Sequence, residues 1–175
     1  EYPHLIYTGN NQTVLVYSAG TNENLMARKI NADGSSAWAS DTKIYRGGFP
    51  PVPLQVIMKA TAGPDGGVLV SWYDDRDFTG SYSNYISYIK SDGSYGFSTG
   101  IEGTKLSNVS NYSCMSPYVI YDDKTKNIYA IWNQMDQTSQ ENQGIYMQKL
   151  SLEGELLWGK EGKAVIPIQN ALNYG

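Results

Sequence analysis

The segment GIYMQKLSLEGELLW at residues 144–158 indicates the fold, because the chain contains its pattern three times. Residues 24–38 and 83–97 share its features: a strand-like segment, then an acid followed by glycine, then an aromatic residue four positions after that glycine. The acid–glycine pairs are Asp33-Gly34, Asp92-Gly93 and Glu153-Gly154. Such regular self-similarity indicates a repeat architecture, in which each repeat is one supersecondary unit.

Each repeat also contains further short strands. A second strand ends in an aromatic residue, in segments 14–17, 68–72 and 128–132. Before it, a first strand opens with proline, in segments 3–7, 53–58 and 117–121. Proline is tolerated at a strand start because it has no ladder N–H to lose there. A last strand after each turn includes Ile44, Leu106 and Val165. Four short antiparallel strands are therefore expected in each repeat.

A single four-stranded meander cannot bury both of its faces, whereas radial stacking of several such sheets buries them. We therefore predict an all-β chain of three β-propeller blades, at residues 1–48, 49–111 and 112–175, which together form one domain or part of one. A β-sandwich is the alternative fold. Because propellers close with 4–8 blades, we expect either two paired chains or a fragment of a longer propeller. The missing initiator Met and the stop at Gly175 favour the fragment.

Composition excludes several classes of function. Thirteen Lys and Arg against 17 Asp and Glu give a net charge of −4, the wrong sign for a nucleic-acid-binding protein. The longest apolar run, residues 128–132, is far shorter than the ~20 residues of a membrane helix, so no membrane insertion is expected. Cys114 and His4 are the single cysteine and histidine. They provide neither a disulfide framework nor a zinc cluster, and no Ser–His–Asp triad is supported.

Residues 66–76, GGVLVSWYDDR, and residues 144–165 resemble the propeller repeats of secreted and surface proteins of bacteria. In that family a Gly-Gly-led strand ends in Trp-x-Asp-x-Arg, and the next strand ends in an Asp-Gly turn with Trp. The resemblance implies an extracellular or envelope location and no particular activity. The turns are also loosely similar to the Asp-box of sialidase-type propellers, although glycine here follows the acid directly. That box is a structural turn, so it implies no catalysis.

The densest polar cluster follows the second strand of the second repeat. The candidate ligand-binding residues are Tyr73, Asp74, Asp75, Arg76, Asp77 and, at the same place in the third repeat, Asp136. Such oxygens suit a Ca²⁺ ion or a carboxylate pair for glycosidic cleavage. Alternatively, an aspartate caps the loop and pairs with Arg76 to hold the blade turn. The spacing does not follow the EF-hand pattern, so no cofactor and no metal site is predicted.

Tyrosine rings form a second candidate surface, since their faces and hydroxyls suit sugars and protein partners. The tyrosines of the second repeat and its exit are Tyr73, Tyr82, Tyr85, Tyr95 and Tyr112. Strands favour tyrosine in any case, so blade packing is the competing interpretation of these rings.

We predict a non-catalytic propeller module, and hence no enzyme, that mediates contact with a protein or glycan surface. The alternative is part of a carbohydrate-active propeller enzyme, glycosidase-like or sialidase-like, that uses the loop carboxylates. The expected partners are a protein or glycan surface and either a second copy of the chain or further blades of its parent.

Overall fold

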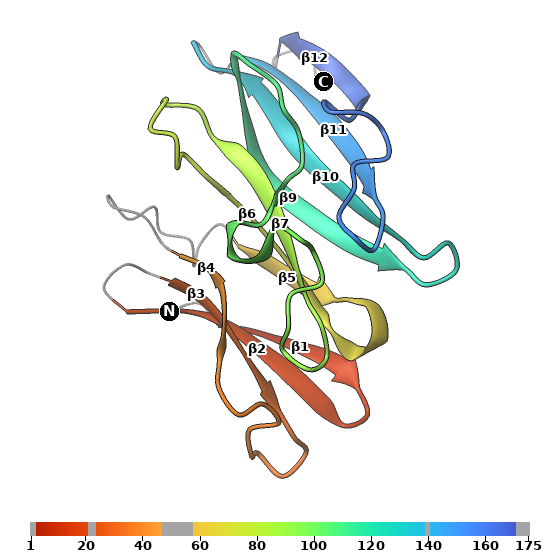
Figure 1. Ribbon diagram of the computed structural model, residues 1–175. Coiled ribbons are helices and arrows are strands. Elements are labelled where there is room, and N and C mark those ends of the chain that lie inside the picture. The colour runs from red at the N-terminus through yellow and green to blue at the C-terminus, as the bar shows by residue number, and fades with distance from the viewer. Residues whose placement is uncertain (1–2, 21–23, 47–57, 139–140, 171–175) are drawn as a thin grey trace.

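The computed structural model describes residues 3–20, 24–46, 58–138 and 141–170, and within them the regular structure is almost entirely β-strand. Three four-stranded antiparallel sheets follow one another along the chain (Figure 1). In each sheet the strands pair in chain order, as in a meander. The predicted all-β fold of three four-stranded antiparallel blades is confirmed.

The strands of the three blades have the following bounds. The first blade consists of β1 (His4–Gly9), β2 (Gln12–Ala19), β3 (Asn24–Ile30) and β4 (Thr42–Tyr45). The second consists of β5 (Lys59–Ala62), β6 (Val68–Asp74), β7 (Ser83–Ile89) and β8 (Thr104–Lys105). The third consists of β9 (Tyr112–Asp122), β10 (Asn127–Asp136), β11 (Asn142–Leu150) and β12 (Lys163–Asn170). Two short 3₁₀ turns, η1 (Pro64–Gly66) and η2 (Gly100–Glu102), lie in the connections.

The predicted start of a strand at Pro117 is wrong, because β9 begins at Tyr112 and carries Pro117 in its middle. Ser116, directly before this proline, has a positive φ of 54°, and the pairing of β9 with β10 shifts at the same level. An edge strand with a local irregularity can hold a proline without losing a regular ladder bond. Most of the predicted segment 53–58 lies outside the described residues, and β5 begins at Lys59.

The three acid–glycine turns share one geometry. Each glycine N–H donates to the carbonyl three residues earlier at 3.0–3.1 Å. The φ angles of these glycines lie between 85° and 89°, a region that glycine enters without steric cost. In the first two turns Asp33 and Asp92 also accept the N–H of the serine two residues later, at 2.9 Å. The same glycine requirement therefore recurs in every blade.

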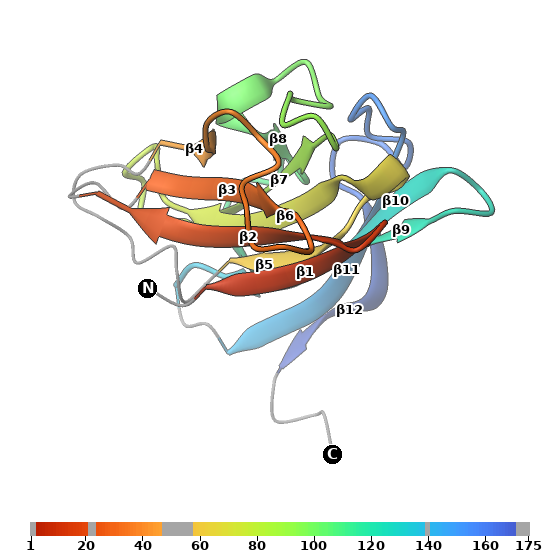
Figure 2. The ribbon, with the colours of Figure 1, turned by 90° about the horizontal axis from the view of Figure 1, so that it is seen from below.

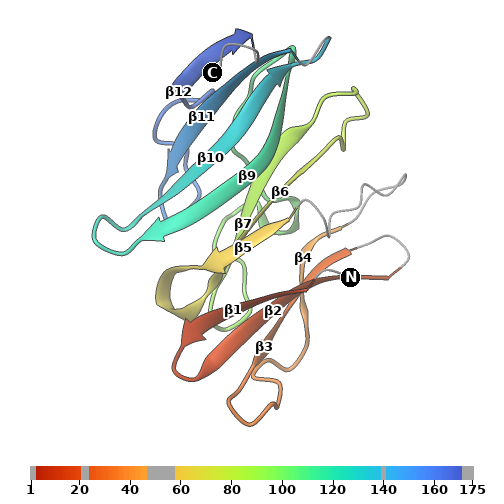
Figure 3. The ribbon, with the colours of Figure 1, turned by 180° about the vertical axis from the view of Figure 1, so that it is seen from behind.

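The blades pack face to face, with β5 lying between β1 and β9 at one edge of the stack (Figure 3). Side chains alternate along a strand, so each blade has two buried faces to fill. In β6, Val70 and Trp72 pack into the core shared with the first blade, whereas Leu69 packs into the core shared with the third. We call the face toward the following blade the leading face and the face toward the preceding blade the trailing face.

The large aromatic residues lie between neighbouring blades, as the repeat predicts. Trp72 and Trp132, in the second strands, are buried on trailing faces, and Trp38 and Phe97, after the turn glycines, are buried on leading faces. The prediction that the second strands end at their aromatic residues is wrong, because β10 continues to Asp136 and β2 continues to Ala19. The stacked sheets are seen from below in Figure 2. Among the described residues, no helix has the length and apolar character needed to cross a membrane.

The two ends of the blades differ in construction. At the turn end lie the three acid–glycine turns and the β5–β6 and β9–β10 connections. At the loop end lie the β6–β7 and β10–β11 connections (Figure 1). The turn end repeats one motif in every blade, whereas the loop end carries polar segments that differ between blades. Variable loops on a rigid scaffold are where binding residues are most often found.

Candidate functional site

Asp74, at the end of β6, has structural partners for both carboxylate oxygens. Its side chain is only 3% exposed and accepts a hydrogen bond from Trp72 Nε1 at 2.9 Å. It also accepts from Arg76 Nε at 2.9 Å and Nη2 at 2.7 Å. In the third blade Gln134 occupies the equivalent place and accepts from Trp132 Nε1 at 3.3 Å. The shared role of this position is therefore to hold the tryptophan between the blades.

Arg76 lies between two tyrosine rings at the junction of the first and second blades. Its guanidinium carbon is 4.4 Å from the ring centre of Tyr45 and 3.5 Å from that of Tyr85. Nη1 donates to the carbonyl of Glu102 at 2.8 Å. Burial by itself lowers the pKa of Arg76, but the hydrogen bonds and charge of Asp74 outweigh it and raise that pKa. Asp74 and Arg76 thus form a buried ion pair that supports the junction, as the structural alternative predicts.

The buried tyrosines predict a late alkaline titration. Burial raises the pKa of Tyr45, Tyr85 and Tyr88 to about 12, above the ordinary value of 10. A raised folded-state pKa contributes stability that is complete below pH ~10 and is lost as pH rises through ~12. Tyrosinate absorbance should show three rings ionising late, with unfolding beginning in that interval. If the tyrosines of the folded protein ionised over the same pH range as those in concentrated denaturant, while the circular dichroism stayed native, this expectation would be contradicted.

Asp75 and Asp136 close the two long connections at the loop end. Asp75 accepts the N–H groups of Thr79 and Gly80, both at 2.8 Å. Asp136 accepts the N–H of Thr138 at 3.1 Å and that of Asn142 at 2.9 Å. Tyr73, the remaining aromatic candidate of the cluster, packs edge-on against Tyr82 with ring centres 5.4 Å apart. These predicted ligand-binding residues therefore have structural contacts in the loops themselves.

Asp77 is exposed and lines a hollow of about 280 Å³ at the loop end of the junction between the second and third blades. Within the described residues its carboxylate takes part in no hydrogen bond or ion pair. The other lining residues are Thr79, Ser81, Ser83, Lys105, Val109, Ser110, Asn111, Tyr112 and Gln137. Of the predicted cluster, Asp77 alone reaches this hollow.

A second hollow, of about 270 Å³, adjoins the first and shares Val109, Ser110 and Tyr112 with it. Its other lining residues are Gln134, Tyr146, Glu161, Gly162 and Ile168. We call the two hollows together the loop-end cleft. Sequence reasoning included Tyr112 among the candidate rings but missed Lys105 and Glu161. Neither lies near Asp77 in the sequence, so no local signal linked them to it.

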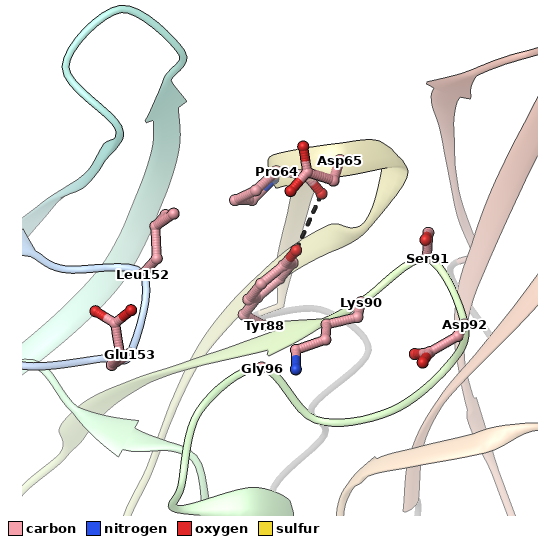
Figure 4. A pocket seen from close by; sticks show the side chains of 9 residues that line it. All are labelled: Pro64, Asp65, Tyr88, Lys90, Ser91, Asp92, Gly96, Leu152 and Glu153. Atoms are coloured by element: carbon pink, nitrogen blue, oxygen red, sulfur yellow. Dashed lines mark hydrogen bonds between the residues drawn. The ribbon is translucent and has the colours of Figure 1, made fainter.

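The turn end of the same junction holds a larger hollow, of about 410 Å³ (Figure 4). Asp65, Asp92 and Glu153 approach it from separate turns, with Lys90 between them. Tyr88 donates its hydroxyl hydrogen to the carbonyl of Pro64 at 3.0 Å. This hollow is built from the structural turn that every repeat contains. In the described ranges, no three of His, Cys, Asp and Glu are grouped as a metal ion would require.

No family model and no curated protein matches this sequence. Three similar solved structures are a family 43 glycoside hydrolase from Bacillus licheniformis, an endo-1,5-α-L-arabinanase from Thermotoga petrophila and an endo-arabinase from Bacteroides thetaiotaomicron. Their identities to this chain are 17%, 16% and 10%, and their TM-scores 0.48, 0.47 and 0.45. The alignments cover 98%, 88% and 94% of this chain but 44%, 41% and 62% of the others. The chain thus spans less than two thirds of each of these proteins.

These comparisons overturn the prediction that the chain is not an enzyme. The three structures are glycoside hydrolases by name, and a further similar structure is a puromycin hydrolase, at 13% identity and a TM-score of 0.46. The non-catalytic interpretation is therefore withdrawn. At such low identity the likeness concerns the fold alone, and the chemistry has to come from the residues of this chain.

Proposed function

We propose that this chain is part of a carbohydrate-active propeller enzyme that binds a glycan in the loop-end cleft. The proposal rests on the placement of Asp77 in a hollow of about 280 Å³. Asp77 is exposed, and its carboxylate forms no hydrogen bond or ion pair with the described residues. The other aspartates of its loop, Asp74 and Asp75, already hold the junction and the loop. Asp77 is therefore the carboxylate of this cluster that is available to a substrate.

The lining of the cleft supports a glycan as the ligand. Hydroxyl and amide groups dominate it, and each can both donate to and accept from a sugar hydroxyl. Tyr112 adds a ring whose face can stack on a sugar and whose hydroxyl can hydrogen-bond to it. A hollow with several convergent polar groups is the usual form of a small-ligand site.

Glycosidic hydrolysis uses two carboxyl groups, and the cleft has a second one in Glu161. One carboxylic acid donates its proton to the leaving glycosidic oxygen as the bond to the anomeric carbon breaks. The other carboxylate takes a proton from the water whose hydroxyl joins that carbon. Asp77, which lines the first hollow, and Glu161, which lines the second, are the pair proposed for these roles.

In the test, the chain is incubated with a panel of neutral polysaccharides that includes α-1,5-arabinan. Hydrolysis is measured as the release of reducing sugar, and binding is measured by titration calorimetry. Asp77→Asn is expected to lower hydrolysis at least ~100-fold, because acid–base groups contribute about 10²–10⁴ to the rate. Binding should remain, since the amide keeps the shape of the side chain. Glu161→Gln should behave in the same way.

Asp65→Asn is the matched control, because Asp65 is also an exposed acid but lines the turn-end hollow. It is expected to leave hydrolysis unchanged. Loss of activity in Asp65→Asn together with full activity in Asp77→Asn would reject the loop-end cleft as the site. If the chain neither hydrolyses nor binds any glycan of the panel, the proposal itself is rejected.

A further inference from the structure

The outer face of the third blade has the same construction as the faces buried between blades. Strand register repeats, so equivalent positions can be compared. Ile44, Leu106 and Val165 occupy one such position on the leading faces. In each blade, the residue directly before it in the chain pairs with the same position of the third strand. Ile44 and Leu106 are fully buried, whereas Val165 is 53% exposed. Further apolar residues of this third leading face are Tyr118, Ile120, Tyr129, Ile131, Ile145, Met147 and Trp158.

The polar groups that join blades recur on this face as well. At the first junction Trp38 Nε1 donates to the carbonyl of Ser91 at 2.9 Å, in the acid–glycine turn of the second blade. Lys29, also on the first blade, donates to the same carbonyl at 3.3 Å. Trp158 and Lys149 occupy the corresponding positions on the third blade. Its leading face therefore has donors placed to receive the turn of another blade.

The trailing face of the first blade offers such a turn. A Cβ added at Gly93 would lie 3.2 Å from the ring of Trp38, and one at Gly154 would lie 2.8 Å from the ring of Phe97. Both turn glycines are thus in close contact with the aromatic residue of the preceding blade. A Cβ at Gly34 would meet nothing within 4 Å. The first turn has the same shape as the other two, but no aromatic ring of the described residues lies in front of it.

Apolar side chains are exposed on this trailing face too. Leu5 pairs with Leu15 in the first blade as Val119 pairs with Ala130 in the third. Val119 is buried against the second blade, whereas Leu5 is 68% exposed. Extended apolar patches on both outer faces are typical of surfaces that bind another protein surface.

We propose that these two faces bind each other in a pair of identical chains. The leading face of the third blade in one copy packs against the trailing face of the first blade in the second copy. The third blade of the second copy packs in the same way against the first blade of the first copy. Head-to-tail contacts of this kind form a closed ring when the rotation between copies completes a turn. Two copies of the 175-residue chain supply six blades, a number within the 4–8 of known propellers. The occupant that we propose for both faces is a second copy of this 175-residue chain, because the faces complement each other as the buried faces of neighbouring blades do.

The experiment is light scattering behind a sizing column on the 175-residue chain over a dilution series. A mass of twice 19.4 kDa is expected. Ile131→Asp places a charge on the third leading face and should raise the dissociation constant at least ~10-fold, because a buried charge without a partner is strongly unfavourable. Phe78→Asp is its control: it also changes an exposed apolar residue, but one in the β6–β7 loop.

The second pair of variants tests the head-to-tail arrangement. Gly34→Asn should weaken pairing at least ~10-fold, since its side chain would overlap Trp158 of the other copy. Gly80→Asn is matched to it, because Gly80 also has positive φ and no atom within 4 Å of an added Cβ. Circular dichroism verifies that each variant is folded. A monomeric chain throughout the series would overturn the proposal. A dimer that resists Ile131→Asp or Gly34→Asn, or one that the two controls weaken equally, would overturn it as well.

Discussion

Replacing Arg76 by methionine is expected to lower the free energy of unfolding by about 3–5 kcal/mol. Methionine keeps the length and apolar character of the side chain but removes the guanidinium that donates twice to Asp74. The Asp74 carboxylate is 3% exposed, so the variant would leave it buried without its cation. Removing one member of a buried ion pair lowers the free energy of unfolding far more than the intact pair raises it. The loss should appear as a lower denaturation midpoint in guanidinium chloride.

Two further variants separate this effect from a general loss of charge. Lys126→Met removes a cation from the exposed pair with Asp123 and should leave the midpoint unchanged, because exposed ion pairs contribute little. The double variant Asp74→Asn with Arg76→Met should recover part of the loss, since no uncompensated charge is then buried. If the double variant were less stable than Arg76→Met alone, the buried charge would not be the cause.

Truncating Trp132 to alanine is also expected to cost about 3–5 kcal/mol, the range for a large aromatic removed from a core. Its side chain is buried in the core between the second and third blades, and its ring stacks on Tyr146 at 6.3 Å. A Cβ at Gly162 would lie 2.8 Å from this ring, so the indole fills its space closely. Alanine would leave a cavity at the junction and free the Oε1 of Gln134 from its indole donor.

Trp132→Phe is the informative control, because it keeps a ring in the same space and removes only the indole hydrogen bond and part of the volume. Its loss should be less than half of that in Trp132→Ala. Leu157→Ala, at an exposed leucine of the same blade, should leave the midpoint in place. All denaturations are run at one protein concentration, since self-association makes apparent stability depend on it. Equal losses in the alanine and phenylalanine variants would mean that the hydrogen bond, rather than packing, dominates.

The blades could be predicted from local features of the chain. A glycine with positive φ after an acid, at a regular interval, marks the same turn in each repeat. The segment Asn24–Ile30 is the clearest example: its composition also suits a short helix, but its repeat partners are strands, and the structure pairs it as β3. Repetition supplied the information that propensity alone lacked. Pro117 shows the limit of this approach, because the irregularity of β9 depends on pairing with β10 rather than on local preference.

The polar cluster after β6 could be found in the sequence, but the use of each carboxylate could not. Asp74, Asp75 and Asp77 are near neighbours in the chain, yet they face a partly buried arginine, a loop backbone and an exposed hollow respectively. The hydrogen bonds of Asp74 and Asp75 are local, within residues 72–80. The hollow beside Asp77, in contrast, forms only when the second and third blades are in contact. Lys105, in β8, and Glu161, in the β11–β12 connection, line the cleft from other parts of the chain, and no spacing in the sequence links them to Asp77.

The repeat, the turn glycines, the aromatic residues between the blades and the all-β class could all be predicted from the sequence, because each follows from local backbone geometry and from alternation along a strand. The folded chain was needed to see which carboxylate lines the cleft and which apolar faces remain uncovered. Both depend on contacts between residues that lie far apart in the chain, and those contacts are set by the way one blade packs against the next.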